Sequence, residues 1–94
     1  MAFKPFDLTG KAAVITGGNG GIGLGMAEGL AAAGADIAIW GRNADKNAAA
    51  LERLKAHGTR VEALEVDVAD EQAVVDAMAE SLSRLGRIAS CIAN

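Results

Sequence analysis

The sequence predicts an α/β protein with a doubly wound parallel sheet, and three observations support this class. Short β-branched runs alternate with longer segments of helical periodicity along the 94 residues. Apolar residues make up 51% of the chain with two Phe, one Trp and no Tyr, so Ala, Val, Ile and Leu dominate, as in buried parallel strands. Finally, glycines concentrate where the first run meets the first helical segment.

Each element has a local signal. Strands are expected in the β-branched runs over residues 12–16, 36–40, 61–68 and 88–93. Helices are expected where apolar residues recur every three or four positions, over residues 22–33, 44–57 and 71–85. Asn43 and Asp70 are residue types that cap helix starts. Gly34, Gly58 and Gly86 follow the three periodic segments and are expected to end the helices.

The third helix has the widest apolar stripe. Its members mark one face of the helix, which is expected to pack either in the core or at an interface, and they are Val74, Val75, Met78, Leu82 and Leu85. The second helix has a narrower stripe of Leu51 and Leu54.

Strands joined through single helices form right-handed crossovers and a parallel sheet. The expected strand order is 3-2-1-4, truncated after the fourth strand, with the order reversing between the first and fourth. Ligands of such sheets bind at the reversal, beyond the carboxyl ends of the strands. The glycine turn and Asn94 are expected on the two sides of this crevice.

The turn reads TGGNGGIG from Thr16 to Gly23. A glycine-rich turn that leads into a helix exposes backbone N–H groups beside the positive end of the helix dipole, which favours a pyrophosphate. Glycines at 18, 20 and 23 satisfy the general dinucleotide spacing G-x-G-x-x-G, and those at 17, 21 and 23 satisfy T-G-x-x-x-G-x-G. A plain flexible turn without ligand is the alternative.

Composition argues against several other classes. The formal net charge is −3 and no basic run occurs, so a nucleic-acid partner is not expected. No apolar stretch is long enough to suggest a membrane span. The single cysteine, Cys91, excludes an internal disulfide and fits the cytoplasm. No His, Cys, Asp or Glu spacing suggests a metal site.

Four segments carry a family resemblance: "LTGKAAVITGGNGGIG", "GADIAIWGRN", the "DV" of Asp67 and Val68, and the final "IAN". On these the chain resembles the N-terminal half of the short-chain dehydrogenase/reductase family. The resemblance implies a Rossmann-like fold, a nicotinamide dinucleotide cofactor and hydride transfer with an alcohol or ketone substrate. It also implies a homotetramer or homodimer. The segments are slightly more similar to sugar-acid dehydrogenases than to 3-oxoacyl carrier-protein reductases, the second choice.

The resemblance also assigns cofactor-binding residues. Four in the glycine turn are expected to line the diphosphate and adenosine ribose, namely Gly17, Asn19, Gly20 and Ile22. Asp67 and Val68 are expected at the adenine, although Asp67 could instead cap the turn after the third strand. Asn94 is expected near the nicotinamide ribose. Trp40 could either shelter the adenine or pack in the core.

Arg42 and Asn43, after the second strand, are also assigned to the cofactor. Dinucleotide folds that bind NAD place an acid here for the ribose hydroxyls, but this chain has Gly41 followed by Arg42. A guanidinium suits a 2′-phosphate, so NADP is expected to be preferred, with NAD possible. The alternative is a solvated Arg42, diverted by Asp45.

No catalytic residue is assigned within residues 1–94, because the family's Ser, Tyr and Lys lie further along its members. The chain is therefore expected to be the N-terminal half of a single dinucleotide-binding domain in a longer polypeptide, and inactive alone. A small independent domain is the alternative. A non-catalytic nucleotide-binding or scaffold protein is the competing function.

Overall fold

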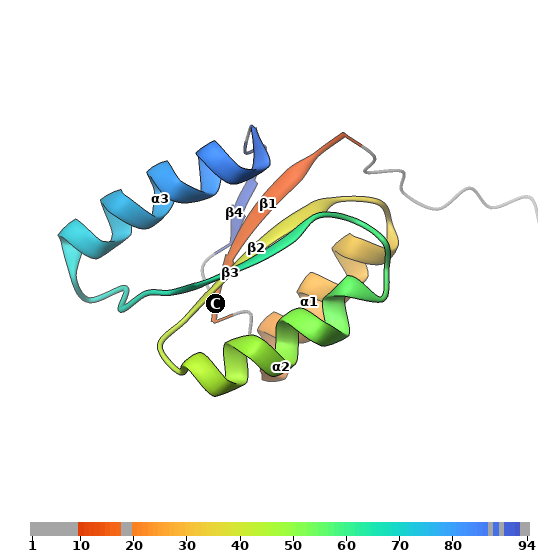
Figure 1. Ribbon diagram of the computed structural model, residues 1–94, viewed down its shortest axis with the longest axis horizontal. Helices are drawn as coiled ribbons and strands as arrows, with labels where there is room; N and C mark the ends of the chain where they lie inside the picture. The colour runs from red at the N-terminus through yellow and green to blue at the C-terminus, as the bar shows by residue number, and fades with distance from the viewer. Residues whose placement is uncertain (1–9, 18–19, 87, 89, 93–94) are drawn as a thin grey trace, which may run out of the picture.

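The computed structural model describes residues 10–17, 20–86, 88 and 90–92. Strands and helices alternate in the expected order (Figure 1). The elements are β1 (Ala12–Thr16), α1 (Gly21–Ala32), β2 (Asp36–Gly41), α2 (Ala44–Lys55), β3 (Val61–Glu65), α3 (Glu71–Leu85) and β4 (Ser90–Ile92).

The four strands form one parallel sheet in the order β3-β2-β1-β4, which is the order that the sequence predicts. Ile15 of β1 lies in register with Ile39 of β2 on one side and with Ile92 of β4 on the other. The order reverses at β1, so the glycine turn that follows β1 starts at the reversal.

Helices cover both faces of the sheet, with α1 and α2 on one face and α3 on the other (Figure 1). The side chains of β1 and β2 alternate between these faces, as the two-residue period of a strand requires. The cluster under α1 and α2 comprises Ala13, Ile15, Ala27, Ala31, Ala35, Ile37, Ile39, Ala50, Leu54 and Val61. The cluster under α3 comprises Ala12, Val14, Ala38, Trp40, Val66, Ala77 and Leu85.

The predicted helix ends are largely confirmed. The Asn43 side chain accepts a hydrogen bond from the Lys46 amide at 3.0 Å, and Asp70 caps α3 in the same way. Gly34 and Gly86 have φ values of 104° and 83°, in the left-handed region that favours glycine at a helix end.

Three predicted boundaries are wrong by two or three residues. Helix α2 ends at Lys55 instead of His57, because the His57 and Gly58 amides donate to carbonyls only three residues back, in a tightened final turn. Strand β3 ends at Glu65 instead of Val68, although the Val66 amide still donates to the Gly41 carbonyl at 3.1 Å. Residues 66–68 thus leave the sheet beside the end of β2. Strand β4 begins at Ser90 instead of residue 88, and residues 89 and 93 lie outside the described residues.

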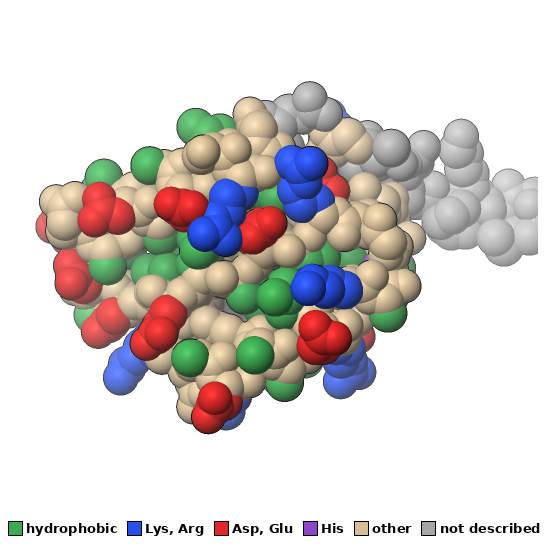
Figure 2. Space-filling view, in the orientation of Figure 1, with side chains coloured by type: hydrophobic (Ala, Val, Ile, Leu, Met, Phe, Trp, Pro, Cys, Tyr) green, Lys and Arg blue, Asp and Glu red, His purple; other side chains and the backbone are tan. Residues whose placement is uncertain are grey.

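The predicted apolar face of α3 is divided between the core and the surface. Val75 and Leu82 are 58% and 48% exposed, and Figure 2 shows hydrophobic side chains at the surface over this helix. The buried positions are Ala77, Ser81 and Leu85, a stripe rotated from the predicted one. Contact with β2 and β3 therefore selects which of the apolar residues on α3 are buried.

Polar contacts join the end of α3 to β3. The Arg84 guanidinium pairs with Glu62 at 2.8 Å and with Glu80 at 2.6 Å, and these hydrogen bonds raise the pKa of Arg84 above its ordinary value. Arg60 donates to the Arg84 carbonyl at 2.8 Å. Acidic and basic side chains are interspersed over the face drawn in Figure 2. Within the described part of the chain, no helix is both long enough and apolar enough to span a bilayer.

Candidate cofactor site

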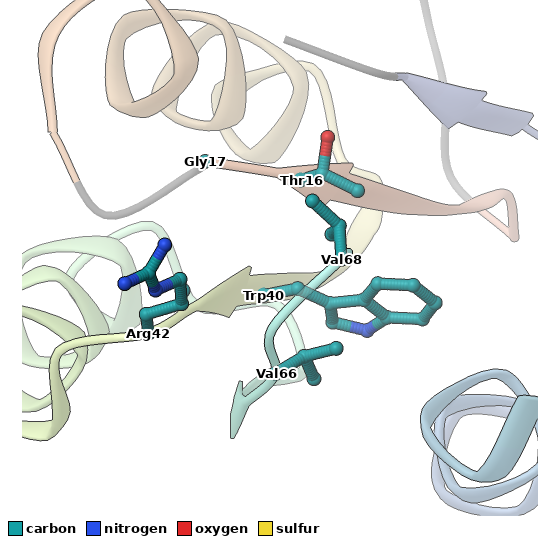
Figure 3. Close-up of a pocket in the computed structure, with 7 residues that line it drawn as sticks. Thr16, Gly17, Trp40, Arg42, Val66 and Val68 are labelled. Atoms are coloured by element: carbon teal, nitrogen blue, oxygen red, sulfur yellow. The ribbon is translucent and has the colours of Figure 1, made fainter. Parts of the chain in front are cut away.

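A pocket of about 190 Å³ lies at the carboxyl ends of β1 and β2, on the β2 side of the reversal between β1 and β4 (Figure 3). Three segments contribute to its walls: the end of β1, the end of β2 and the residues that follow β3. The lining residues are Thr16, Gly17, Trp40, Gly41, Arg42, Val66 and Val68. Val66 and Val68 form part of this wall just beyond the end of β3, where the Val66 amide still donates to the Gly41 carbonyl.

Gly17 forms the rim on the β1 side. Its φ of 68° lies in the left-handed region, and its amide donates to the Trp40 carbonyl at 2.8 Å. A side chain at this position is strained, because L residues rarely adopt such a backbone conformation. The backbone conformation of this turn, which joins the end of β1 to the end of β2 through the Gly17 amide, therefore favours glycine.

Helix α1 begins four residues after Gly17. Gly20 has extended backbone and Gly21 a φ of 57°, and no side chain caps the first turn. Ile22 is 75% exposed beside this helix start. The positive end of the α1 dipole thus adjoins the turn after β1, as the pyrophosphate prediction requires. Gly18 and Asn19, between Gly17 and Gly20, lie outside the described residues.

Trp40 forms the inner wall of the pocket. Its ring is 2% exposed and in Figure 3 extends between Val66 and Val68. The indole Nε1 donates to the Ser81 Oγ on α3 at 3.0 Å, and Ser81 is fully buried. The packing role of Trp40 is confirmed, since the side chain belongs to the α3 cluster, and because Trp40 also lines the pocket its adenine role stays a prediction. Sequence reasoning missed Ser81, whose position four residues after Ala77 was the available signal.

Arg42 supplies the charge at the outer rim. Its side chain is exposed and in Figure 3 extends from the end of β2 away from the Trp40 ring. Among the ion pairs of the described residues, none joins Arg42 to Asp45, so the predicted diversion does not occur. Asn43 lies next to Arg42 but outside the pocket lining, with its side-chain oxygen engaged in capping α2.

Asp67 and Val68 follow β3. Val68 is 56% exposed and lines the pocket, whereas Asp67 does not. The Asp67 carboxylate accepts a hydrogen bond from the Ala69 amide at 3.0 Å, which is the turn-capping contact that the sequence left open. The same carboxylate is solvent-exposed, so capping and ligand contact are compatible in Asp67. Asn94 lies outside the described residues.

A buried amide supports the pocket from behind. Asn47 of α2 is 5% exposed, and its Nδ2 donates to the Gly41 carbonyl at 3.0 Å and to the Leu64 carbonyl at 3.2 Å. Sequence reasoning missed it because only apolar residues of α2 were considered. The available signal was its place four and seven residues before Leu51 and Leu54, on the same face of the helix.

No group of three His, Cys, Asp or Glu side chains among the described residues is arranged to hold a metal ion. The pocket instead combines apolar walls, a glycine rim with a helix start, and one exposed guanidinium. In a doubly wound sheet, ligands bind beyond the carboxyl ends of the strands, where this pocket lies.

The fold and this site define a Rossmann-type α/β domain. The family model for short chain dehydrogenases matches residues 11–94, and the chain belongs to this family. Gluconate 5-dehydrogenase from Gluconobacter oxydans is 38% identical over 89 residues, which cover 95% of this chain and 35% of that protein. The 3-oxoacyl-[acyl-carrier-protein] reductase of Chlamydia pneumoniae is 37% identical over 81 residues, 86% of this chain and 33% of that one.

Solved structures agree. L-sorbose reductase from Gluconobacter frateurii, complexed with NADPH and L-sorbose, is 38% identical and matches with a TM-score of 0.87. The match covers 92% of this chain and 33% of that one. The chain thus spans about a third of the length of these relatives.

Proposed function

We propose that the protein containing this chain is an NAD(P)-dependent oxidoreductase, and that this chain binds the adenosine half of the cofactor. The observation that carries the proposal is the pocket at the carboxyl ends of β1 and β2, with its glycine rim and Arg42. The bound nicotinamide would exchange a hydride with an alcohol or ketone carbon. Similarity to gluconate 5-dehydrogenase and L-sorbose reductase supports a sugar or sugar-acid substrate. A 3-oxoacyl thioester is the second candidate, supported by the carrier-protein reductase.

The residues fit an adenosine diphosphate in chemical terms. Gly17, Gly20 and Ile22 would hold the diphosphate and ribose, where bare backbone adjoins the start of α1. The apolar side chain of Val68 would contact the adenine ring, with the exposed carboxylate of Asp67 at its amino group. We place Asn19 at the adenosine ribose and Asn94 at the nicotinamide ribose, from the family resemblance alone.

The end of β2 supports a preference for NADP over NAD. Gly41 supplies no carboxylate to repel a 2′-phosphate, and Arg42 offers a permanently charged, planar fork at the pocket. Asn43 would adjoin the same phosphate through its backbone, since its side chain caps α2. A charge-assisted hydrogen bond contributes about 1.5–3 kcal/mol, so the preference is expected to be roughly tenfold to a hundredfold.

The test is kcat/KM for NADP and NAD in the whole protein and in its Arg42→Ala variant. We expect the variant to lose roughly tenfold to a hundredfold with NADP and little with NAD. Lys46→Ala is the matched control, because it removes an exposed cation from the first turn of α2 that does not line the pocket. An NAD preference in the wild type, or equal losses in both variants, would contradict the role of Arg42.

The substrate class needs a separate assay. Wild-type protein with NADPH as the hydride donor should reduce a keto sugar or keto sugar acid faster than a 3-oxoacyl thioester. NADP binding with no turnover of either class would favour a non-catalytic nucleotide-binding protein.

A further inference from the structure

The Asn47 amide joins the carboxyl ends of two neighbouring strands. Its two N–H bonds leave from one nitrogen, and Nδ2 lies 3.0 Å from the Gly41 carbonyl of β2 and 3.2 Å from the Leu64 carbonyl of β3. The residue is buried, and its bond to the Gly41 carbonyl is buried while the bond to the Leu64 carbonyl is partly buried. A buried amide costs free energy unless it is hydrogen-bonded, and here its donors are used to connect strands.

Both strand ends lead directly into the pocket. Gly41 lines it and precedes Arg42, while Leu64 lies two residues before Val66, the next lining residue. The Gly41 carbonyl also accepts the Val66 amide at 3.1 Å, so one carbonyl oxygen links all three parts: α2, β2 and the segment after β3.

Arg42 is held on both sides by contacts of α2. On one side, Asn47 holds the carbonyl of Gly41. On the other, Asn43 is tied to the Lys46 amide at 3.0 Å. The backbone of Arg42 is therefore fixed before any ligand binds, and only its side chain loses freedom on binding.

We propose that Asn47 is a positioning residue for the cofactor pocket: it sets the spacing of the β2 and β3 ends and the direction of Arg42. The inference rests on the proposed function of the pocket. A purely structural role would make Asn47 matter for stability alone. The positioning role makes it matter for ligand affinity at temperatures where the protein is fully folded.

The experiment measures dissociation constants for 2′,5′-ADP and ADP by calorimetry on the whole protein, with KM and kcat for NADP. Asn47→Leu keeps a similar volume and removes both donors. It should weaken 2′,5′-ADP about tenfold, since small displacements of a positioned group have effects of this size, and weaken ADP less. KM for NADP should rise with kcat unchanged. Asn47→Ser retains one small donor and should give an intermediate loss.

Leu51→Ala is the matched control. Leu51 lies on the same helix as Asn47, packs against the cluster under α1 and α2, and does not line the pocket. The substitution should lower Tm and leave both affinities unchanged. Unaltered affinities in Asn47→Leu, or an equal loss in Leu51→Ala, would overturn the positioning role alone. If Asn47→Leu does not fold, the nucleotide affinities of Asn47→Ser decide whether Asn47 has the positioning role. Failure of the wild type to bind either nucleotide would overturn the proposed function and this inference with it.

Discussion

Removing the hydroxyl of Ser81 should destabilise the protein far more than its small volume suggests. Ser81 is fully buried on α3 and accepts the only hydrogen bond that the structure gives to the Trp40 indole, at 3.0 Å. In Ser81→Ala the indole N–H stays buried without an acceptor. Such an orphaned donor costs about 1–3 kcal/mol, and we expect a loss in this range in the free energy of unfolding.

A double-mutant cycle separates this bond from packing. Trp40→Phe removes the donor and also leaves a void, so the single variant is destabilised for two reasons. In that background no indole N–H is present to donate to the Ser81 hydroxyl. A helical serine can instead donate to a backbone carbonyl of its own helix. Ser81→Ala should then cost much less, which gives a coupling energy of about 1–2 kcal/mol, within the range for residues in contact.

The assay is urea unfolding of the whole protein at one protein concentration, followed by circular dichroism, for the wild type, both single variants and the double variant. Ser83→Ala is the control, since Ser83 is an exposed serine on the same helix, and its effect should stay within about 0.5 kcal/mol. A coupling energy near zero, or equal losses at positions 81 and 83, would refute the argument.

Three further outcomes are expected in the same unfolding assay. Gly29→Ala should stabilise by about 1 kcal/mol, because Gly29 is exposed within α1 and an added Cβ meets nothing within 4 Å. Gly86→Ala should destabilise by about 1–2 kcal/mol although a Cβ there also meets nothing within 4 Å, because φ of Gly86 is 83°. Equal effects at the two glycines would show that backbone conformation does not matter. Arg84→Ala should destabilise the protein at low salt and much less in 1 M NaCl, where the Debye length is about 3 Å, because the ion pairs of Arg84 are exposed. A loss of stability that does not depend on salt would contradict this.

Sequence reasoning succeeded where the signal was local. Asn43 and Asp70 cap the helices that follow them through contacts only three residues long, and Gly34 and Gly86 end helices through their own backbone angles. The strand order could also be predicted, because the handedness of parallel crossovers leaves few arrangements once the glycine turn is placed after β1.

It failed where the partner lies far along the chain. Ser81 and Trp40 are separated by 41 positions and Asn47 and Leu64 by 17, so helical spacing can place each polar residue on a buried face but cannot name its hydrogen-bond partner. Leu82 fits an apolar pattern yet is exposed, because the rotation of α3 depends on its contacts with the sheet. The pocket walls were foreseen in part, through residues that a family resemblance could name.

The two faces of the sheet differ in whether their hydrophobic cluster contributes to the pocket. The cluster under α1 and α2 contains none of the residues that line the pocket, whereas the cluster under α3 includes Trp40 and Val66, which do. Residues on opposite faces share few partners, so substitutions in them should combine nearly additively. An engineer could therefore raise heat tolerance through the apolar residues of the α1–α2 cluster, keeping Asn47 so that cofactor choice stays intact, and could alter the pocket through Trp40 and Val66 without rebuilding that cluster.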